Sequence, residues 1–408
     1  MGNKIIVVGG GASGMMAAII AKRNGGEVTI LERNDRVGKK ILATGNGRCN
    51  YTNKFLSVNN YHGNNPKFAH SPLSAFNVDM TIDFFESLGI TPALEDNGKV
   101  YPLSFQSSSM LDILRYEIED LGIDLVTEAY VVDIKKAGGF RVRTKDERVF
   151  HSDKLILATG GMSLPASGSD GNGYTLGKKL NHKITDVFPG LVQLKLESNL
   201  LKSMDGVKFL GRAGVYLGGE LILEDRGDIL FTSYGISGPP ILQISRTALK
   251  HLRDGKEVNL RVSIIHTKTA EELFNYLGNR FRQMKNRTVE TGLVGLVNKR
   301  LIIPILKELN IDKNKNANKL TKEEIRSIAD LLTSWEFKVI GSQSWGQAQA
   351  TAGGISTDQV NKQTMESKIV DGLYIVGELL DIDGDCGGFN LQWAWSSGYV
   401  AGLHAAKS

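Results

Sequence analysis

The sequence predicts an α/β fold: a doubly wound sheet with a β-meander, interrupted by a β-rich domain that carries a helical insertion. Three observations predict it. A strand, a glycine turn and a helix open the chain in residues 3–24. Alternating, strand-like segments take over from about residue 190. The strand-then-glycine pattern returns near residue 373, so both ends of the chain are expected to build one domain.

In the first domain, short β-branched runs that end in glycine or a polar residue predict buried strands at 3–8, 27–32, 154–161 and 373–377. Apolar spacing predicts helices at 12–24, 76–88, 107–121 and 391–406. Alternation predicts strands at 125–135, 139–144 and 147–151, which would form the meander.

In the middle of the chain, alternation predicts strands within 191–198, 213–224, 227–232, 257–265 and 336–341. Helices are expected at 269–284 and 321–335, with a looser helical pair between them. We therefore assign 1–190 and 355–408 to the first domain, 191–268 and 336–354 to the β-rich domain, and 269–335 to the helical insertion.

The bulk composition is that of an ordinary globular protein, with 41% apolar and 23% charged residues over 408 positions. Its two cysteines, Cys49 and Cys386, fit a reducing compartment without a disulfide framework. No uninterrupted apolar run approaches the length of a membrane span. We therefore expect a soluble, cytoplasmic protein with no membrane partner, and its oligomeric state stays open.

The net charge of +5 is unevenly distributed along the chain. Residues 246–330 hold 18 Lys and Arg residues against 10 Asp and Glu residues, an excess that suits an acidic partner. Acidic residues interleave with these cations at Glu271, Glu272, Glu323 and Glu324. A solvated helical surface is therefore the favoured interpretation.

The turn after the first strand has the spacing Gly9-x-Gly11-x-x-Gly14. Gly9 permits a tight turn, Gly11 lets the backbone approach a pyrophosphate, and Gly14 lets the helix pack closely on the sheet. The helix start, with Ala12 and Ser13, presents free N–H groups to the phosphates. This segment therefore predicts a dinucleotide site.

Glu32 closes the second strand, where a carboxylate binds the ribose hydroxyls of a dinucleotide without a 2′-phosphate. The stretch that follows is long, cationic and rich in Gly and Asn, which suits a cofactor that continues past its pyrophosphate. Its cofactor-binding candidates are Arg33, Gly38, Lys39, Lys40, Thr44, Gly45, Asn46 and Asn50.

The C-terminal segment supplies a second half of this site. Gly377 and Glu378 end a strand, where the carboxylate would accept hydrogen bonds from a ribityl hydroxyl. Gly388, Asn390 and Leu391 lead into the last helix, whose positive end would stabilise negative charge on a reduced flavin ring. Alternatively, Asn390 only caps that helix. Because an NAD dehydrogenase needs only the N-terminal half, the two halves together predict FAD.

The sequence resembles the BaiN-like (YhiN-like) family of NAD(P)/FAD-dependent oxidoreductases, also described as aminoacetone-oxidase-family FAD-binding enzymes. The resemblance is carried by GKKILATGNGRCNYTN, TGGMSLPASGSDGNGY, FTSYGISGPPIL, TAGGIS and TMESKIVDGLYIVGELLDIDGDCGGFNLQWAWSSG, which together span nearly the whole chain. It implies FAD and a Rossmann-like FAD-binding domain interrupted by a β-barrel-like domain with a helical insertion. It also implies that Val131, Ala158, Thr159 and Gly160 lie near the adenosine. Cys386 departs from the family pattern.

Arg48 is the candidate catalytic residue, because a fixed cation beside the isoalloxazine would bind a substrate carboxylate or stabilise reduced flavin. A phosphate contact is its alternative role. Thr232 and Ser237 are candidate ligands for an anionic substrate group at a helix start. Ser237 alternatively acts only as the N-cap of a helix with Pro239 in its first turn.

Two further patterns are set aside. Asp381, Asp383 and Asp385 have the spacing of a calcium loop, but Cys386 and Gln392 replace its glycine and glutamate. The histidines form no ligand pattern either, so no metal is expected. Cys49 and Cys386 lack the spacing of a redox-active pair.

These residues together predict a FAD-dependent oxidoreductase that transfers a hydride between a small organic substrate and the flavin. NAD(P)H is expected at most as a transient donor, because no second GxGxxG follows a strand. A flavin-dependent RNA-modifying enzyme is one alternative, although the basic insertion lacks interleaved aromatic residues, which argues against a nucleic-acid partner. A non-catalytic redox sensor is the other.

Overall fold

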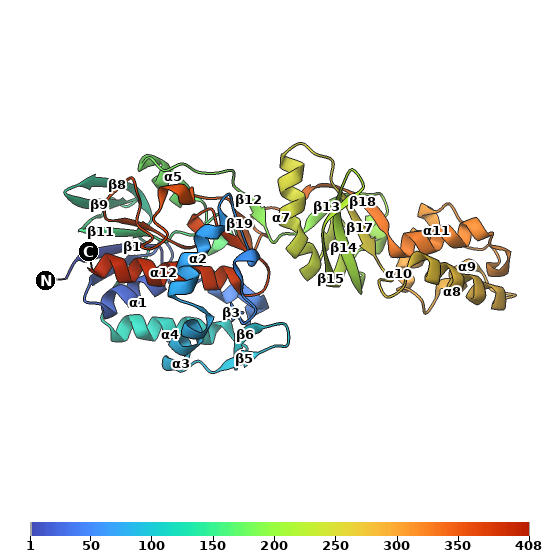
Figure 1. Ribbon diagram of the computed structural model, residues 1–408, viewed down its shortest axis with the longest axis horizontal. Coiled ribbons are helices and arrows are strands. Elements are labelled where there is room, and N and C mark those ends of the chain that lie inside the picture. Colours follow the sequence, from blue (N-terminus) through green and yellow to red (C-terminus); the bar gives the residue numbers. More distant parts are fainter. Residues whose placement is uncertain (1, 408) are drawn as a thin grey trace. The chain divides into compact units, whose positions relative to one another are not determined.

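A five-stranded parallel sheet forms the centre of the first of two units in the computed structural model, which describes residues 2–407 (Figure 1). Unit 1 contains the residues before 191 and after 344, and unit 2 contains residues 191–344. The sheet order is β20-β11-β1-β2-β7, which is the order of a doubly wound sheet and so confirms the predicted fold class. Its strands are β1 (Lys4–Val8), β2 (Glu27–Leu31), β7 (Asp124–Val126), β11 (Lys154–Leu157) and β20 (Leu373–Ile375).

The strand register aligns the ends of the strands. Val8 pairs with Leu31 on one side and with Leu157 on the other, and Leu157 pairs with Ile375. The turns after β1, β2, β11 and β20 therefore leave the same edge of the sheet. In a doubly wound fold, ligands bind at this edge.

Helices and smaller sheets complete unit 1. Its helices are α1 (Ala12–Arg23), α2 (His70–Ala75), α3 (Val78–Ser87), α4 (Ser107–Asp120), α5 (Asn172–Lys179) and α12 (Phe389–Lys407). The predicted antiparallel meander is formed by β8 (Val131–Ala137), β9 (Gly139–Thr144) and β10 (Val149–Ser152). The smaller sheets pair β3 (Thr52–Asn53) and β5 (Pro92–Leu94) with β6 (Lys99–Pro102), β4 (Tyr61–His62) with β21 (Asp383–Gly384), and β12 (Phe188–Gly190) with β19 (Ala350–Ala352).

The first and last helices of the chain, α1 and α12, lie side by side (Figure 1). Two glycines of α12 permit their close approach. A Cβ at Gly398 would lie 2.4 Å from the Ser13 carbonyl oxygen, and a Cβ at Gly402 would lie 2.3 Å from that of Ala17. Both distances are shorter than any contact a real Cβ makes, so only glycine lets the two backbones approach this closely.

Unit 2 is a closed six-stranded barrel with helices. The strand order is β13 (Leu194–Glu197), β16 (Gly235–Ser237), β15 (Glu220–Thr232), β14 (Lys208–Leu217), β17 (Asn259–Ser263) and β18 (Trp335–Ser342). Its core contains a cluster of aromatic rings, Phe231, Trp335 and Phe337. The helices are α6 (Leu201–Met204), α7 (Pro239–Arg253), α8 (Ala270–Gln283), α9 (Val289–Leu293), α10 (Lys299–Glu308) and α11 (Lys322–Thr333). Helices α8, α9 and α11 gather in one group (Figure 1).

The structure corrects several expected boundaries. The single strand expected at 125–135 is two strands, because β7 pairs with β2 and the chain then turns at Glu128, whose φ is 53°. The segment 213–224 spans a hairpin turn at Gly218 and Gly219, which both have positive φ. The β-rich segment was expected to end at residue 354, but β19 pairs with β12 in unit 1, and the contact-based boundary lies at residue 344.

Gly402→Ala is expected to lower the free energy of unfolding by roughly 1–3 kcal/mol, because the added methyl forces α12 away from α1. The matched control is Gly278→Ala in α8, where a Cβ meets no described atom within 4 Å. Replacing this helical glycine should leave stability unchanged or raise it. Urea unfolding followed by tryptophan fluorescence measures both variants, and equal midpoints for Gly402→Ala and wild type would contradict the packing argument.

Candidate functional site

A cavity opens where the turns after β1, β2, β11 and β20 leave the sheet, and it encloses about 1150 Å³ including its open mouth. Both ends of the chain line it. The predicted cofactor residues among its walls are Gly9, Gly11, Ala12, Ser13, Glu32, Arg33, Gly38, Lys39, Lys40, Thr44, Val131, Ala158, Thr159, Gly160, Glu378, Asn390 and Leu391.

The glycine turn before α1 is shaped as its sequence spacing requires. Gly9 has a φ of +105°, and a Cβ there would lie 2.5 Å from the Ala158 carbonyl oxygen. A Cβ at Gly14 would lie 1.9 Å from the Gly9 carbonyl oxygen. At Gly11, in contrast, a Cβ would meet no described atom within 4 Å, although the residue lines the cavity. The space beside Gly11 is thus available to a ligand, at the end of α1 where N–H groups lack intrahelical acceptors.

The Glu32 carboxylate is held in place by backbone and side-chain donors. It accepts hydrogen bonds from the Gly10 N–H at 2.8 Å, and from the Asn34 N–H and Nδ2 at 2.8 Å each. The side chain is buried, at 6% exposure, yet lines the cavity. A carboxylate fixed in this way keeps acceptor capacity for a ribose hydroxyl.

A cationic and aromatic wall lies beside Glu32. The Arg33 guanidinium lies 4.5 Å from the centre of the Tyr130 ring and forms an ion pair with Asp170. Asn172 donates from Nδ2 to the Val131 carbonyl oxygen at 2.8 Å. The Val131 carbonyl oxygen therefore has one protein partner, and the expected place of Val131 near the adenosine stays a prediction.

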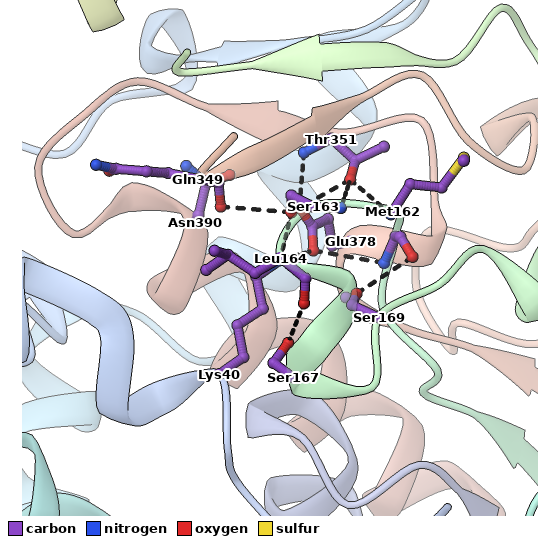
Figure 2. A network of polar contacts seen from close by, with 12 residues as sticks. Lys40, Met162, Ser163, Leu164, Ser167, Ser169, Gln349, Thr351, Glu378 and Asn390 are labelled. Atoms are coloured by element: carbon purple, nitrogen blue, oxygen red, sulfur yellow. Dashed lines mark hydrogen bonds and ion pairs between the residues drawn. The ribbon is translucent and has the colours of Figure 1, made fainter. Parts of the chain in front are cut away.

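A network of polar contacts joins four segments of unit 1 at the cavity (Figure 2). Lys40 Nζ lies 2.6 Å from Glu378 Oε2 and 2.5 Å from Ser163 Oγ. Ser163 Oγ donates to Glu378 Oε1 at 2.9 Å, and the Thr351 N–H donates to the same oxygen at 2.6 Å. Burial opposes the charged form, but Lys40, Ser163 and Thr351 keep the pKa of Glu378 below its ordinary value. This carboxylate is therefore ionised and already bonded within the protein, so its expected contact with a ribityl hydroxyl stays a prediction.

The N-terminal end of α12 also lines the cavity, through Asn390, Leu391 and Ala394. The helix begins at Phe389, so Asn390 lies in its first turn and is not its N-cap. The Asn390 side chain instead accepts from the Gly384 N–H at 2.9 Å and donates to the Gly384 carbonyl oxygen at 2.8 Å. The positive end of α12 is thereby fixed at the cavity.

The cavity fits an extended dinucleotide cofactor such as FAD. Two helix N-termini, from opposite ends of the chain, line the same space. In addition, Thr159 Oγ1 is buried and has no hydrogen-bond partner among residues 2–407, although Thr159 lines the cavity. A buried hydroxyl without a partner is destabilising, and a polar cofactor would supply one.

Six predicted cofactor residues lie outside the cavity walls: Gly14, Gly45, Asn46, Asn50, Gly377 and Gly388. The glycines among them have local roles; at Gly388, for example, a Cβ would lie 2.5 Å from the Thr52 carbonyl oxygen. Asn46 has a φ of 55° in a turn of the 3₁₀ segment η1 (Ile41–Gly47). Any cofactor contact by these six residues stays a prediction.

Arg48 does not line the cavity. Its guanidinium forms an ion pair with Glu95 at 3.2 Å and stacks on Tyr101, 4.5 Å from the ring centre. Its catalytic role stays a prediction. Thr232 and Ser237 belong to unit 2. Ser237 ends strand β16, and the residue before helix α7 is Gly238, so the expected N-cap role of Ser237 is wrong.

Cys49 and the acidic residues Asp381 and Asp385 have contacts that do not point to a redox or metal site. Burial raises the pKa of the Cys49 thiol to about 12, so it is protonated at neutral pH and a poor nucleophile. Asp381 accepts from the Asn64 N–H at 3.1 Å, and Asp385 contacts His62 Nε2 at 2.8 Å. Across residues 2–407, no group of three or more His, Cys, Asp or Glu side chains is arranged to hold a metal ion.

The sequence analysis missed part of the cavity wall, chiefly Tyr130, Ser167, Gly168, Ser169, Asp170, Asn172 and Gln349. Four of them lie between β11 and α5 and Asn172 begins α5, all within the Ser- and Gly-rich block TGGMSLPASGSDGNGY. That composition marks a loop that follows a buried strand, which was an available signal.

The chain is similar to several known proteins. A family model described as the HI0933-like protein Rossmann domain matches residues 3–404. The chain is 39% identical to a 3-dehydro-bile acid delta(4,6)-reductase of Clostridium scindens, over 99% of each protein. It is 30% identical to a ribosomal RNA dihydrouridine synthase of Escherichia coli, over 99% of this chain and 98% of that protein. It is 27% identical to the protein of the same name from Haemophilus influenzae, over 98% of both.

Gly11→Val is expected to give folded protein without flavin, because the new side chain occupies ligand space and touches no described atom at its Cβ. Flavin content is read from the absorbance of purified protein, and folding from circular dichroism. Gly278→Val, on an open face of α8, is the control and should keep its flavin. A Gly11→Val protein with full flavin content would contradict the phosphate placement.

Glu378 makes the stability of unit 1 depend on pH. Because its pKa is lower in the folded protein, its stabilisation is present above the unfolded pKa of about 4.5 and is lost as the pH falls through the folded value. Glu378→Gln should therefore unfold more easily at neutral pH and lose less stability on acidification than wild type. Urea midpoints at several pH values test this, with the exposed Glu119→Gln as control. Parallel pH profiles for Glu378→Gln and wild type would be the contrary result.

Proposed function

The chain belongs to the HI0933-like Rossmann family, and from this membership we propose that it reduces a carbon–carbon double bond conjugated to a carbonyl group. It is a FAD-dependent oxidoreductase. In this proposal the cavity of unit 1 binds the FAD, and NAD(P)H donates the electrons during a transient visit.

The names of the relatives support the reaction class. One relative is named as a delta(4,6)-reductase of a 3-dehydro bile acid, and two are named as synthases of dihydrouridine in ribosomal RNA. In both kinds of substrate, a double bond next to a carbonyl gains two hydrogens. FAD held by the cavity of unit 1 would supply, when reduced, the hydride that such a bond accepts at its β-carbon. A proton from water or a side chain would complete the α-carbon.

The observation that carries the proposal is that two helix N-termini and the Lys40 ammonium meet at one cavity. The N-terminal ends of α1 and α12 both line it, and Lys40 is fixed there by Glu378 and Ser163. An ammonium has three N–H donors, so two bonded donors leave one for a ligand. Fixed positive charge of this kind binds the pyrophosphate and stabilises negative charge on reduced flavin, which favours acceptance of electrons from the donor.

The distribution of charge favours a uracil ring in RNA as the substrate. Unit 2 contains 24 Lys and Arg residues against 17 Asp and Glu residues, a net charge of +7. The rest of the chain has 25 against 27, a net charge of −2. A cationic unit attached to a flavin unit suits a polyanionic substrate. A small enone is the second candidate, supported by the 39% identity to the bile acid reductase along the full chain.

Anaerobic reduction followed by substrate addition tests this function. NADH or NADPH should bleach the flavin absorbance band, and the band should return when uridine-containing ribosomal RNA is added, with a product two hydrogens heavier. A 3-oxo-4-ene steroid acid is the parallel arm, and recovery of the band with it alone would favour the second candidate. Recovery with oxygen but with neither substrate would overturn the proposed reaction.

A further inference from the structure

The helical part of unit 2 carries a cluster of exposed cations that we call the basic edge: Arg282, Lys285, Arg287, Lys313 and Lys319. Hydrogen bonds to main-chain carbonyl groups join the two segments that hold them. The Ala317 N–H donates to the Arg287 carbonyl oxygen at 2.8 Å, and Asn316 Nδ2 donates to that of Lys285 at 3.0 Å. Residues far apart in sequence thus form one surface.

Three of the four acidic residues that interleave with these cations in the sequence, Glu271, Glu272 and Glu324, have other partners. Glu272 and Glu324 accept from the N–H groups of Thr269 and Thr321, at the starts of α8 and α11. Glu271 pairs with Arg326 at 2.6 Å. Glu324 forms an ion pair with Lys315, which is close in sequence to the basic edge but is not part of it. Glu271, Glu272 and Glu324 therefore do not pair with the cations of the basic edge.

The basic edge is not neutralised by its own neighbours. Within residues 2–407, none of its five side chains takes part in an ion pair. Two carboxylates, Glu290 and Asp312, flank it, and Asp312 accepts from the Asn314 N–H at 3.0 Å. Holding unpaired like charges together on one surface is unfavourable, and a partner that brings negative charge removes the repulsion.

The spread of the cations over the surface indicates a ligand with many negative charges in a row. Its cations are exposed and spread over several segments, whereas a small anion is usually held in a concave site. Exposed amides at Asn286, Asn314 and Asn318 interleave with them and offer further hydrogen bonds. Aromatic residues are not needed for contacts to phosphates, because stacking serves the bases and cations serve the backbone.

We propose that the basic edge is a docking surface for the phosphate backbone of a structured RNA. This inference rests on the proposed function with RNA as the substrate. It places RNA binding on a surface of unit 2. Contacts to phosphates fix position without reading the sequence, so the edge adds affinity that does not depend on the RNA sequence.

The test is a charge reversal in the full-length, FAD-loaded chain: Lys285→Glu, Arg287→Glu and Lys313→Glu together. The control reverses three exposed lysines elsewhere, Lys67→Glu, Lys202→Glu and Lys362→Glu, and so changes the net charge equally. Binding of deproteinised ribosomal RNA is measured by filter retention over a series of salt concentrations. The edge variant should bind about tenfold or more weakly, with a salt slope reduced by roughly two to three, while the control stays close to wild type.

Equal affinity and equal salt slope for the two triple variants would overturn the docking surface. Retention on phosphatidylglycerol vesicles, lost in the edge variant while RNA binding is unaffected, would also overturn it, in favour of a membrane. Flavin content and circular dichroism establish that both variants fold. Anaerobic reoxidation by free uridine or a small enone separates the two proposals, since the edge variant should match wild type there if docking alone is impaired.

Discussion

The contact between α1 and α12 is the constraint on which the rest of unit 1 depends. These helices come from the first 23 and last 20 residues of the chain, and glycine at Gly398 and Gly402 lets their backbones approach. Buried side chains then tie α12 to the sheet. Trp393 Nε1 donates to the Gly377 carbonyl oxygen at 3.0 Å, and Ser397 Oγ accepts from the Gly377 N–H at 3.0 Å. As a result, two helix N-termini line one cavity.

The Glu378 carboxylate holds together the segments that surround the cavity. Its carboxylate gathers Lys40, Ser163 and the Thr351 N–H, which come from three separate segments (Figure 2). Thr351 also accepts from the Met162 and Ser163 N–H groups through Oγ1. A charge that is buried needs such partners, and once paired it fixes the loops that supply them. The loops around the cavity are therefore held before any ligand arrives.

Much of this architecture was predictable, because strand and helix periodicity and the glycine spacing are local properties of sequence. The parallel sheet, the meander and an interrupting β-rich domain follow from them, as do most residues of the cavity wall, whereas the barrel and the family came from the resemblance. What failed depended on contacts between distant residues. The strand expected at 125–135 is divided because β7 pairs with β2, and the β-rich segment ends before 354 because β19 pairs with β12. The sequence also does not give the partners of the acidic residues in 246–330, where capping boxes at Thr269 and Thr321 hold Glu272 and Glu324. No helix among residues 2–407 is long and apolar enough to cross a membrane.

The placement of unit 2 between β12 and β19 has a consequence for biosynthesis. Every strand of the barrel is translated before β20 and α12, so the barrel can close while the nascent chain still lacks the last strand and helix of unit 1. Until α12 is synthesised, α1 lacks the helix that it packs against, and its apolar residues stay exposed. A chain interrupted before α12 would therefore be prone to aggregate and would need chaperones.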